Sequence, residues 1–192
     1  MNNPEYARIG EKKYKINTDF KVAIECDRIA NDDSIDDTER ALAIIYLLFG
    51  DEGLKDSNNY NKLMEIAIKY LSCGKEIITD EEPDMDYIQD MDYIKTSFMS
   101  DYGIELTDMH WWTFFNLING LSNSEFGNCC VLNRIRNIRT YDESKIEDVR
   151  EREKFRKYKE SVKLKKKVPK LTEKQKESVE NFYKLTGIKR KE

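Results

Sequence analysis

Apolar residues recur at intervals of three or four along most of the chain, the spacing that places them on one face of an α-helix. The clearest stripe consists of Tyr87, Met91, Ile94, Phe98 and Tyr102, spaced 4, 3, 4 and 4. At about 100° per residue, these side chains fall within about 80° of the helix surface. Gly103 follows directly, and glycine in this place is typical of a helix end.

The same periodicity predicts seven or eight helices with short connections. Their expected starts are Asn17 or Thr18, Asp36 with Glu39, Tyr60, Thr107 or Asp108, Ser122 with Glu125, Ser144 with Glu147, and Thr172 with Gln175. Each of these pairs is a capping box, in which a Ser, Thr or Asp precedes a Glu or Gln by three residues. The polar segment 50–59 is predicted to be a loop.

One β element is predicted, close to the N-terminus. Gly10 precedes a charged turn, and residues 14–16 alternate between apolar and polar side chains. The predicted fold is therefore mainly α, a multi-helix globular domain with a short N-terminal β-hairpin or arm and a C-terminal helical extension. The expected divisions are an arm at 1–16, a helical core domain at 17–142 and a basic, charged helical extension at 143–192.

Charge is distributed unevenly along the chain, whose net charge is -4. Residues 1–90 carry 11 Lys and Arg against 21 Asp and Glu, whereas residues 141–192 carry 18 against 11. The first ten residues lack the apolar run of a signal peptide, and the four cysteines form no C-x-x-C pair, so we expect reduced thiols in the cytoplasm. The apolar run 41–50 is about half the roughly 20 residues that span a bilayer, so no membrane association is expected.

The stretch "TDMHWWTFF" contains the only histidine and both tryptophans of the chain, as His110, Trp111 and Trp112. On a helical wheel most of the circumference around this segment is apolar, which predicts a central core helix. His110 falls between Leu117 and Leu121, and we interpret it as a polar core residue in the first helical turn. General base catalysis needs an orienting partner and metal binding needs further ligands, and neither is recognisable here.

No motif points to a catalytic residue, a cofactor or a metal. The acidic stretches 31–39 and 80–86 lack the alternating oxygen ligands and central glycine of a calcium loop, so we interpret them as solvated turns. Cys129 and Cys130 are adjacent and are interpreted as buried thiols. Glycine-rich nucleotide-binding motifs are absent from the sequence. A protein without enzymatic activity is therefore expected.

The basic C-terminal segment is the strongest candidate for partner binding. Its candidate contact residues are Arg136, Arg139, Phe155, Tyr158, Lys163, Lys165, Lys166 and Lys167. Such a segment could follow a phosphate backbone, but glutamates are interspersed among most of its cations. Only the run 163–167 is free of acidic residues. A charged amphipathic helix that docks on a protein is favoured over one that binds nucleic acid.

These segments together resemble the gp-fifteen family of phage and prophage proteins from low-GC Gram-positive bacteria. The signature positions are Ser97, Phe98, Tyr102, Gly103, Ile104, Leu106, Met109, His110, Trp111, Trp112, Phe114, Gly120 and Leu121. A segment of the form I-R-x-I-R follows at 135–139 and an S-K-I segment at 144–146, in the family's order. The resemblance covers about residues 7 to 165, and residues 172–188 extend beyond it.

The resemblance implies a role in the assembly of long phage tails. Genes of this type lie between those for the major tail protein and the tape measure protein, where tail assembly chaperones are encoded. A chaperone of this kind binds the long, helical tape measure protein in the host cytoplasm, hands it to tail-tube subunits and is absent from the mature virion. Self-association is also expected, from the charge asymmetry. The alternative is a nucleic-acid-binding phage accessory protein that uses the basic C-terminal segment.

Overall fold

The computed structural model describes residues 3–75, 83–123 and 129–165, and these residues are mainly α-helical, as predicted. The elements in chain order are β1 (Tyr6–Ile9), β2 (Lys12–Lys15), α1 (Phe20–Ala30), α2 (Asp37–Lys55), the 3-10 helix η1 (Ser57–Asn59), α3 (Tyr60–Leu71), α4 (Met91–Tyr102), α5 (Trp111–Asn119), α6 (Val131–Thr140), the 3-10 helix η2 (Glu143–Lys145) and α7 (Val149–Ser161). The predicted helix from Thr172 lies outside the described residues. The expected domain divisions stay a prediction.

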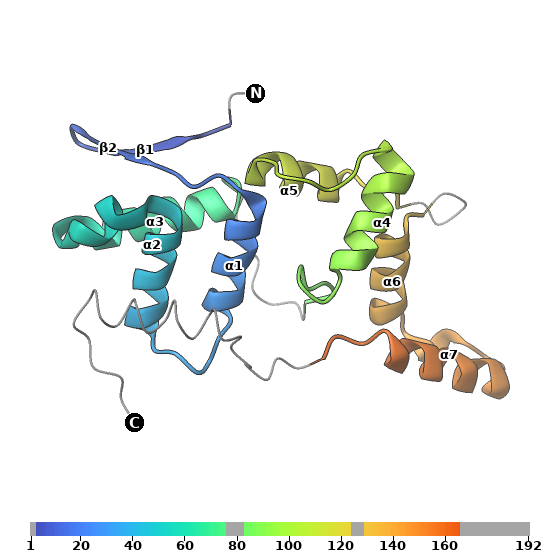
Figure 1. Ribbon diagram of the computed structural model, residues 1–192. Helices are drawn as coiled ribbons and strands as arrows, with labels where there is room; N and C mark the ends of the chain where they lie inside the picture. The colour runs from blue at the N-terminus through green and yellow to red at the C-terminus, as the bar shows by residue number, and fades with distance from the viewer. Residues whose placement is uncertain (1–2, 76–82, 124–128, 166–192) are drawn as a thin grey trace.

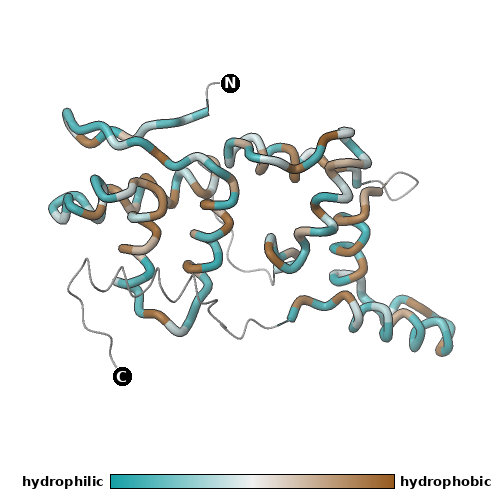
Figure 2. The backbone as a smooth tube through the Cα atoms, viewed as in Figure 1, coloured by the Kyte–Doolittle hydropathy of each residue, from teal (hydrophilic) through white to brown (hydrophobic). Residues whose placement is uncertain are grey.

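The helices form two groups that meet through α5 (Figure 1). In one group α2 packs between α1 and α3, and in the other α4 packs against α6. Helix α5 contacts both α1 and α4, so its side chains link the two groups into one core. Helix α7 extends from the second group (Figure 1), and it is largely hydrophilic along its length (Figure 2).

The predicted N-terminal hairpin is confirmed, and it packs on the helices. Its strands pair antiparallel, with Tyr6 opposite Lys15 and Ile9 opposite Lys12. Tyr14 is buried in the main core, and its hydroxyl donates a hydrogen bond to Asp56 at the end of α2. Lys12 Nζ lies 2.6 Å from the same carboxylate. These contacts attach the hairpin to the corner between α2 and η1.

The Asp56 contacts predict an acid-sensitive attachment of the hairpin. Lys12, Tyr14 and Asn59 all donate hydrogen bonds to the Asp56 carboxylate and hold its pKa well below its usual range. A carboxyl whose pKa is depressed on folding stabilises the folded state above its unfolded pKa, and this contribution is lost as the pH falls. We therefore expect Asp56→Asn to be destabilising at neutral pH, and its deficit to shrink below about pH 4. Chemical denaturation of both proteins across this range tests it; a pH-independent deficit would contradict it.

Several helix starts and ends follow the predicted signals, and others differ. Helix α4 begins at Met91, so Tyr87 of the predicted stripe lies before it, and α5 begins after His110 and not after Thr107 or Asp108. Asp36 caps α2 by accepting a hydrogen bond from the Glu39 N–H at 2.9 Å, and Gly103 ends α4 in the left-handed conformation with φ 65°. The predicted loop at 50–59 is wrong in its first half, because α2 continues to Lys55 beyond a kink at Gly50. Gly50 adopts φ 63° and ψ -158°, a conformation that glycine tolerates because it has no Cβ.

The predicted start of α7 at Ser144 is also wrong, and α6 does not begin at Ser122, whose expected partner Glu125 lies outside the described residues. Helix α6 begins after Cys130, whose sulfur accepts a hydrogen bond from the Asn133 N–H, and α7 begins after Asp148, whose side chain accepts from the Glu151 N–H. A side chain from another helix completes the start of α6, since Ser97 Oγ on α4 accepts a hydrogen bond from the Leu132 N–H at 3.0 Å. Both Ser97 and Leu132 are fully buried.

The Ser97 hydrogen bond predicts a measurable loss of stability on its removal. Ser97→Ala leaves the buried Leu132 N–H without its partner, which should lower the free energy of unfolding by about 1–3 kcal/mol. Ser100 is exposed on the same helix, so Ser100→Ala is the matched control and should change stability by about 0.5 kcal/mol or less. Urea denaturation measures both, and equal losses would contradict the assignment.

Candidate functional site

His110 is the N-cap of α5, so its predicted place inside the first helical turn is wrong. Its backbone is extended, with φ -65° and ψ 136°, and its Nδ1 accepts a hydrogen bond from the Trp112 N–H at 3.0 Å. Because Nδ1 accepts, it carries no proton, and Nε2 donates to the Pro4 carbonyl at 3.2 Å. The ring is partly buried and joins the N-terminal segment to the start of α5.

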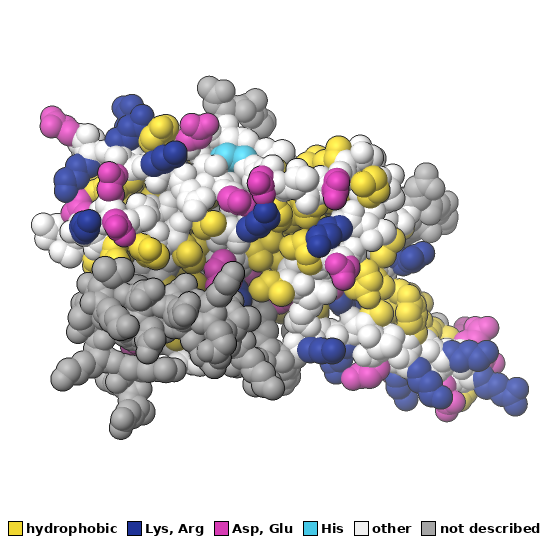
Figure 3. Space-filling model, viewed as in Figure 1, with side chains coloured by type: hydrophobic (Ala, Val, Ile, Leu, Met, Phe, Trp, Pro, Cys, Tyr) yellow, Lys and Arg dark blue, Asp and Glu magenta, His cyan; other side chains and the backbone are white. Residues whose placement is uncertain are grey.

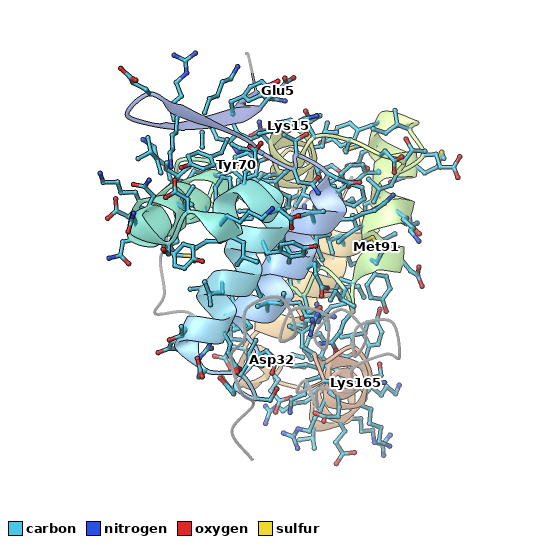
Figure 4. All side chains as sticks on the ribbon, turned by 60° about the vertical axis from the view of Figure 1, so that its left-hand side comes forward. Glu5, Lys15, Asp32, Tyr70, Met91 and Lys165 are labelled. Atoms are coloured by element: carbon cyan, nitrogen blue, oxygen red, sulfur yellow. The ribbon has the colours of Figure 1, made fainter. Side chains whose placement is uncertain are left out.

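The two tryptophans bind the C-terminal end of α3. Trp111 Nε1 donates to the Leu71 carbonyl and Trp112 Nε1 to the Tyr70 carbonyl, each at 3.0 Å. The last carbonyls of a helix have no partner within the helix, and the indole of Trp111 supplies one for Leu71. The Tyr70 carbonyl accepts from the Cys73 N–H as well as from Trp112. Tyr70 itself is buried on α3, beneath the hairpin that carries Glu5 and Lys15 (Figure 4). The adjacent signature residues therefore connect α5 with α3.

The His110 cap predicts a graded effect of substitution. His110→Ala removes the acceptor for the Trp112 N–H and should cost about 1 kcal/mol of stability. Asparagine is among the best N-cap residues, so His110→Asn should recover part of this loss. Thermal and urea unfolding of the two variants test the assignment. Equal losses for alanine and asparagine would contradict a capping role.

The other signature residues form the centre of the core, as the apolar periodicity predicts. Phe98 and Phe114 are fully buried, with ring centroids 5.7 Å apart, and Phe20 of α1 stacks on Phe114 at 4.5 Å. The Tyr102 hydroxyl donates to the Leu117 carbonyl at 2.7 Å, and Leu121 is buried after α5. These residues hold α1, α4 and α5 together.

The two arginines of the I-R-x-I-R segment, Arg136 and Arg139, pair with aspartates that precede α4. Arg139 donates two hydrogen bonds of 2.7 Å to the Asp90 carboxylate, and the two side chains are only 10% and 1% exposed. Its remaining donors bind the Asp84 carbonyl at 2.9 Å and the Val162 carbonyl at 2.6 Å. Arg136 pairs with the Asp84 carboxylate at 3.0 Å. This geometry is that of internal ion pairs, and it lends no support to partner binding by either arginine.

Contacts of Arg139 and of Gln89 also fix the chain directly after α7. Val162, directly after the helix, is buried beneath the Arg139 contact. Lys165 N–H donates to Gln89 Oε1 at 2.8 Å, while Gln89 Nε2 donates to the Lys165 carbonyl at 3.0 Å. The segment after α7 thus returns to the turn before α4, which holds the helix in place.

The remaining candidate residues lie on or near α7. Phe155 is half-buried against the ring of Tyr141, with centroids 5.3 Å apart, while Tyr158 is exposed. The side chains of Lys163 and Lys165 are exposed as well. Lys166 and Lys167 lie outside the described residues. Sequence reasoning missed Tyr141, whose exposure depends on how the loop 141–148 packs against α7.

The described residues contain no group of three or more His, Cys, Asp or Glu side chains that could hold a metal ion. The four cysteines are free thiols. Burial raises the pKa of both Cys26 and Cys73 to about 12, so little reactive thiolate forms at neutral pH. Cys130 is buried as expected, whereas Cys129 is only partly buried. In the ranges that the structure describes, no helix combines the length and apolar character needed to cross a membrane.

The protein is mainly α-helical. In its rare His-Trp-Trp sequence, the histidine caps α5 and the two tryptophans join α5 to α3. The model of the family described as "Bacteriophage Gp15 protein" matches residues 4–164, so the chain belongs to this family and the resemblance drawn from its motifs is confirmed. It is therefore a bacteriophage protein with a structural or assembly-related role. Searches of curated proteins and of solved structures found no significant match.

Proposed function

We propose that this protein is a tail assembly chaperone that binds the tape measure protein in the host cytoplasm during assembly of the tail tube. Family membership supports an assembly-related role, and the gene position implied by the family resemblance supports this client. The handover to tail-tube subunits and the absence of the chaperone from the mature virion belong to the same proposal.

An exposed apolar strip is the observation that carries this proposal. Hydrophobic side chains gather on one face of the molecule from the group of α4 and α6 toward α7 (Figure 3). Tyr141 and Tyr158, near and on α7, remain 43% and 47% exposed. A surface with aromatic side chains suits the apolar face of an amphipathic helix, and the client is a long helical protein. We therefore assign the client contact to Tyr141, Phe155 and Tyr158.

Co-expression with the neighbouring tape measure protein tests the client contact. The two proteins should co-purify, and Tyr158→Ala should reduce the amount of client recovered. Tyr46 on α2 is 40% exposed, so Tyr46→Ala is a matched control that should leave recovery unchanged. Equal recovery with both variants would contradict the assignment to α7, and no recovery with the unmodified protein would contradict the proposed client.

A nucleic-acid-binding accessory protein is the second candidate. The exposed lysines Lys163 and Lys165 favour it, because salt-dependent affinity for phosphates requires accessible cations. The ion pairs of Arg136 and Arg139 count against it, since two of the basic candidates are engaged internally. DNA binding that weakens with salt, and that is lost when Lys163, Lys165, Lys166 and Lys167 are replaced by glutamine, would favour this candidate.

A further inference from the structure

The outward side of α7 carries a basic stripe, formed by Arg150, Lys154 and Lys157. All three side chains are exposed, and the described residues provide no ion pair or hydrogen bond for any of them. With Val149 at 0° and about 100° per residue, the stripe lies between about 80° and 140°, whereas Phe155 falls at about 240°. Tyr158, at about 180°, lies between the two, so the basic stripe borders the aromatic side assigned to the client at this residue and lies well apart from Phe155.

Other cations of α7 hold the helix against its own loop. Arg152 Nε donates to the Ile146 carbonyl at 2.8 Å, Arg156 pairs with Glu143 at 2.9 Å, and Lys159 Nζ donates to the Tyr141 carbonyl at 2.7 Å. Arg152, Arg156 and Lys159 are spaced by four and three residues, so they lie on the side of α7 that faces the loop before it. Because the helix is also fixed at its C-terminal end through Val162, the basic stripe is presented in a defined orientation.

A surface of opposite charge lies on the far side of the same molecule. Residues 20–55, which comprise α1, α2 and their connection, contain four basic and nine acidic residues, a net charge of -5. Residues 149–165 contain eight basic and three acidic residues, a net charge of +5. Asp33, Asp36 and Asp37 are exposed around the start of α2 and form the centre of the acidic surface. Figure 1 shows α2 on one side of the molecule and α7 on the other, with α1, α4 and α6 between them, so the two surfaces do not meet within one chain.

We propose that the basic stripe of α7 binds the acidic surface of α1 and α2 on a second copy of this protein. Charge complementarity selects this partner, since the segments that carry the two surfaces have net charges of opposite sign. The contact joins different surfaces of the two copies, so each pair keeps one free surface of each kind and can add further copies head to tail. The inference concerns the protein alone and does not depend on the identity of its client.

Light scattering coupled to size-exclusion chromatography tests the contact on the full-length chain. At low salt the mass should exceed that of a monomer and rise with concentration, and it should fall to that of a monomer at high salt. One double variant, Lys154→Gln with Lys157→Gln, removes most of the basic stripe. Another, Asp33→Asn with Asp36→Asn, weakens the acidic surface and keeps a side chain that can cap α2. Each should be monomeric at low salt.

Mixing the two double variants provides the decisive result. Each retains the surface that the other lacks, so an equimolar mixture should form dimers and nothing larger. Lys62→Gln with Lys69→Gln, on exposed positions of α3, is the matched control and should keep the mass of the unmodified protein. A monomeric unmodified protein at low salt, an undiminished mass for either double variant, or a monomeric mixture would each overturn the proposal. Circular dichroism of all variants establishes that they are folded.

Discussion

Replacing Arg139 with alanine should lower the free energy of unfolding by about 3–5 kcal/mol, because the substitution leaves the Asp90 carboxylate buried without its partner. Asp90 is only 1% exposed, and Arg139 supplies both of its short contacts with a guanidinium. The change also removes the donors for the Asp84 and Val162 carbonyls. Urea denaturation followed by circular dichroism measures the loss.

Two further variants distinguish the stability contribution of the buried Arg139–Asp90 pair from that of a more exposed ion pair. Arg136 and Asp84 form a comparable pair whose side chains are about one-third exposed, so Arg136→Ala should cost about 1 kcal/mol or less. Replacing both Arg139 and Asp90 with apolar residues removes the unpaired charge, and this double variant should be more stable than Arg139→Ala alone. A loss for Arg139→Ala no greater than that for Arg136→Ala would contradict the role assigned to the network.

Replacing Trp111 with alanine should cost about 3–5 kcal/mol, since the substitution removes a large buried side chain from the junction of the two helical groups. Trp111 is 3% exposed and its ring packs against Phe114 and Tyr87. Its indole N–H also binds the Leu71 carbonyl at the end of α3. Thermal and chemical unfolding measure the effect.

Conservative substitutions distinguish the packing of the indole from its hydrogen bond. Trp111→Phe keeps most of the ring but leaves the Leu71 carbonyl unpaired, so its loss should be smaller than that for alanine. Trp112 is only partly buried, and Trp112→Phe should cost less than Trp111→Phe, although it also removes an indole hydrogen bond. If Trp112→Phe were the more damaging variant, the greater importance given to Trp111 in the core would be wrong.

The sequence predicted the structure best where residues close to one another along the chain determine it. The stripe through Phe98 identifies the buried side of α4, and Gly103 identifies its end, because both signals depend on residues within a few turns. The same holds for Asp36 at the start of α2. The hairpin was also predictable, since alternation and a turn glycine lie within ten residues of each other.

The errors occur where a distant residue decides the local structure. His110 begins α5 because Thr18 and Pro4 contact its segment, through the Trp111 N–H and the imidazole respectively, and these partners are remote in sequence. Arg139 lies in a basic segment, yet its partner Asp90 is 49 residues away and becomes visible only in the fold. An arginine that follows an isoleucine, as Arg136 and Arg139 do, gives no signal that separates an internal pair from a surface contact.

The structure also changes the meaning of the charge asymmetry along the chain. Part of it is neutralised within the molecule, because Asp84 and Asp90 from the acidic half bind arginines of α6. The outward side of α7 keeps its positive charge, and the side of α7 near Tyr141 keeps exposed aromatic rings. Both proposed contacts therefore involve α7, whereas the signature residues stabilise the helical core that carries it.

The solubility of the tape measure protein in cells that co-express this chain tests the proposed function most directly. We expect the soluble fraction of the client to rise on co-expression with the unmodified protein and to rise much less with Tyr158→Ala, while Tyr46→Ala behaves like the unmodified protein. A client that stays equally insoluble with and without the folded, unmodified protein would contradict the chaperone function.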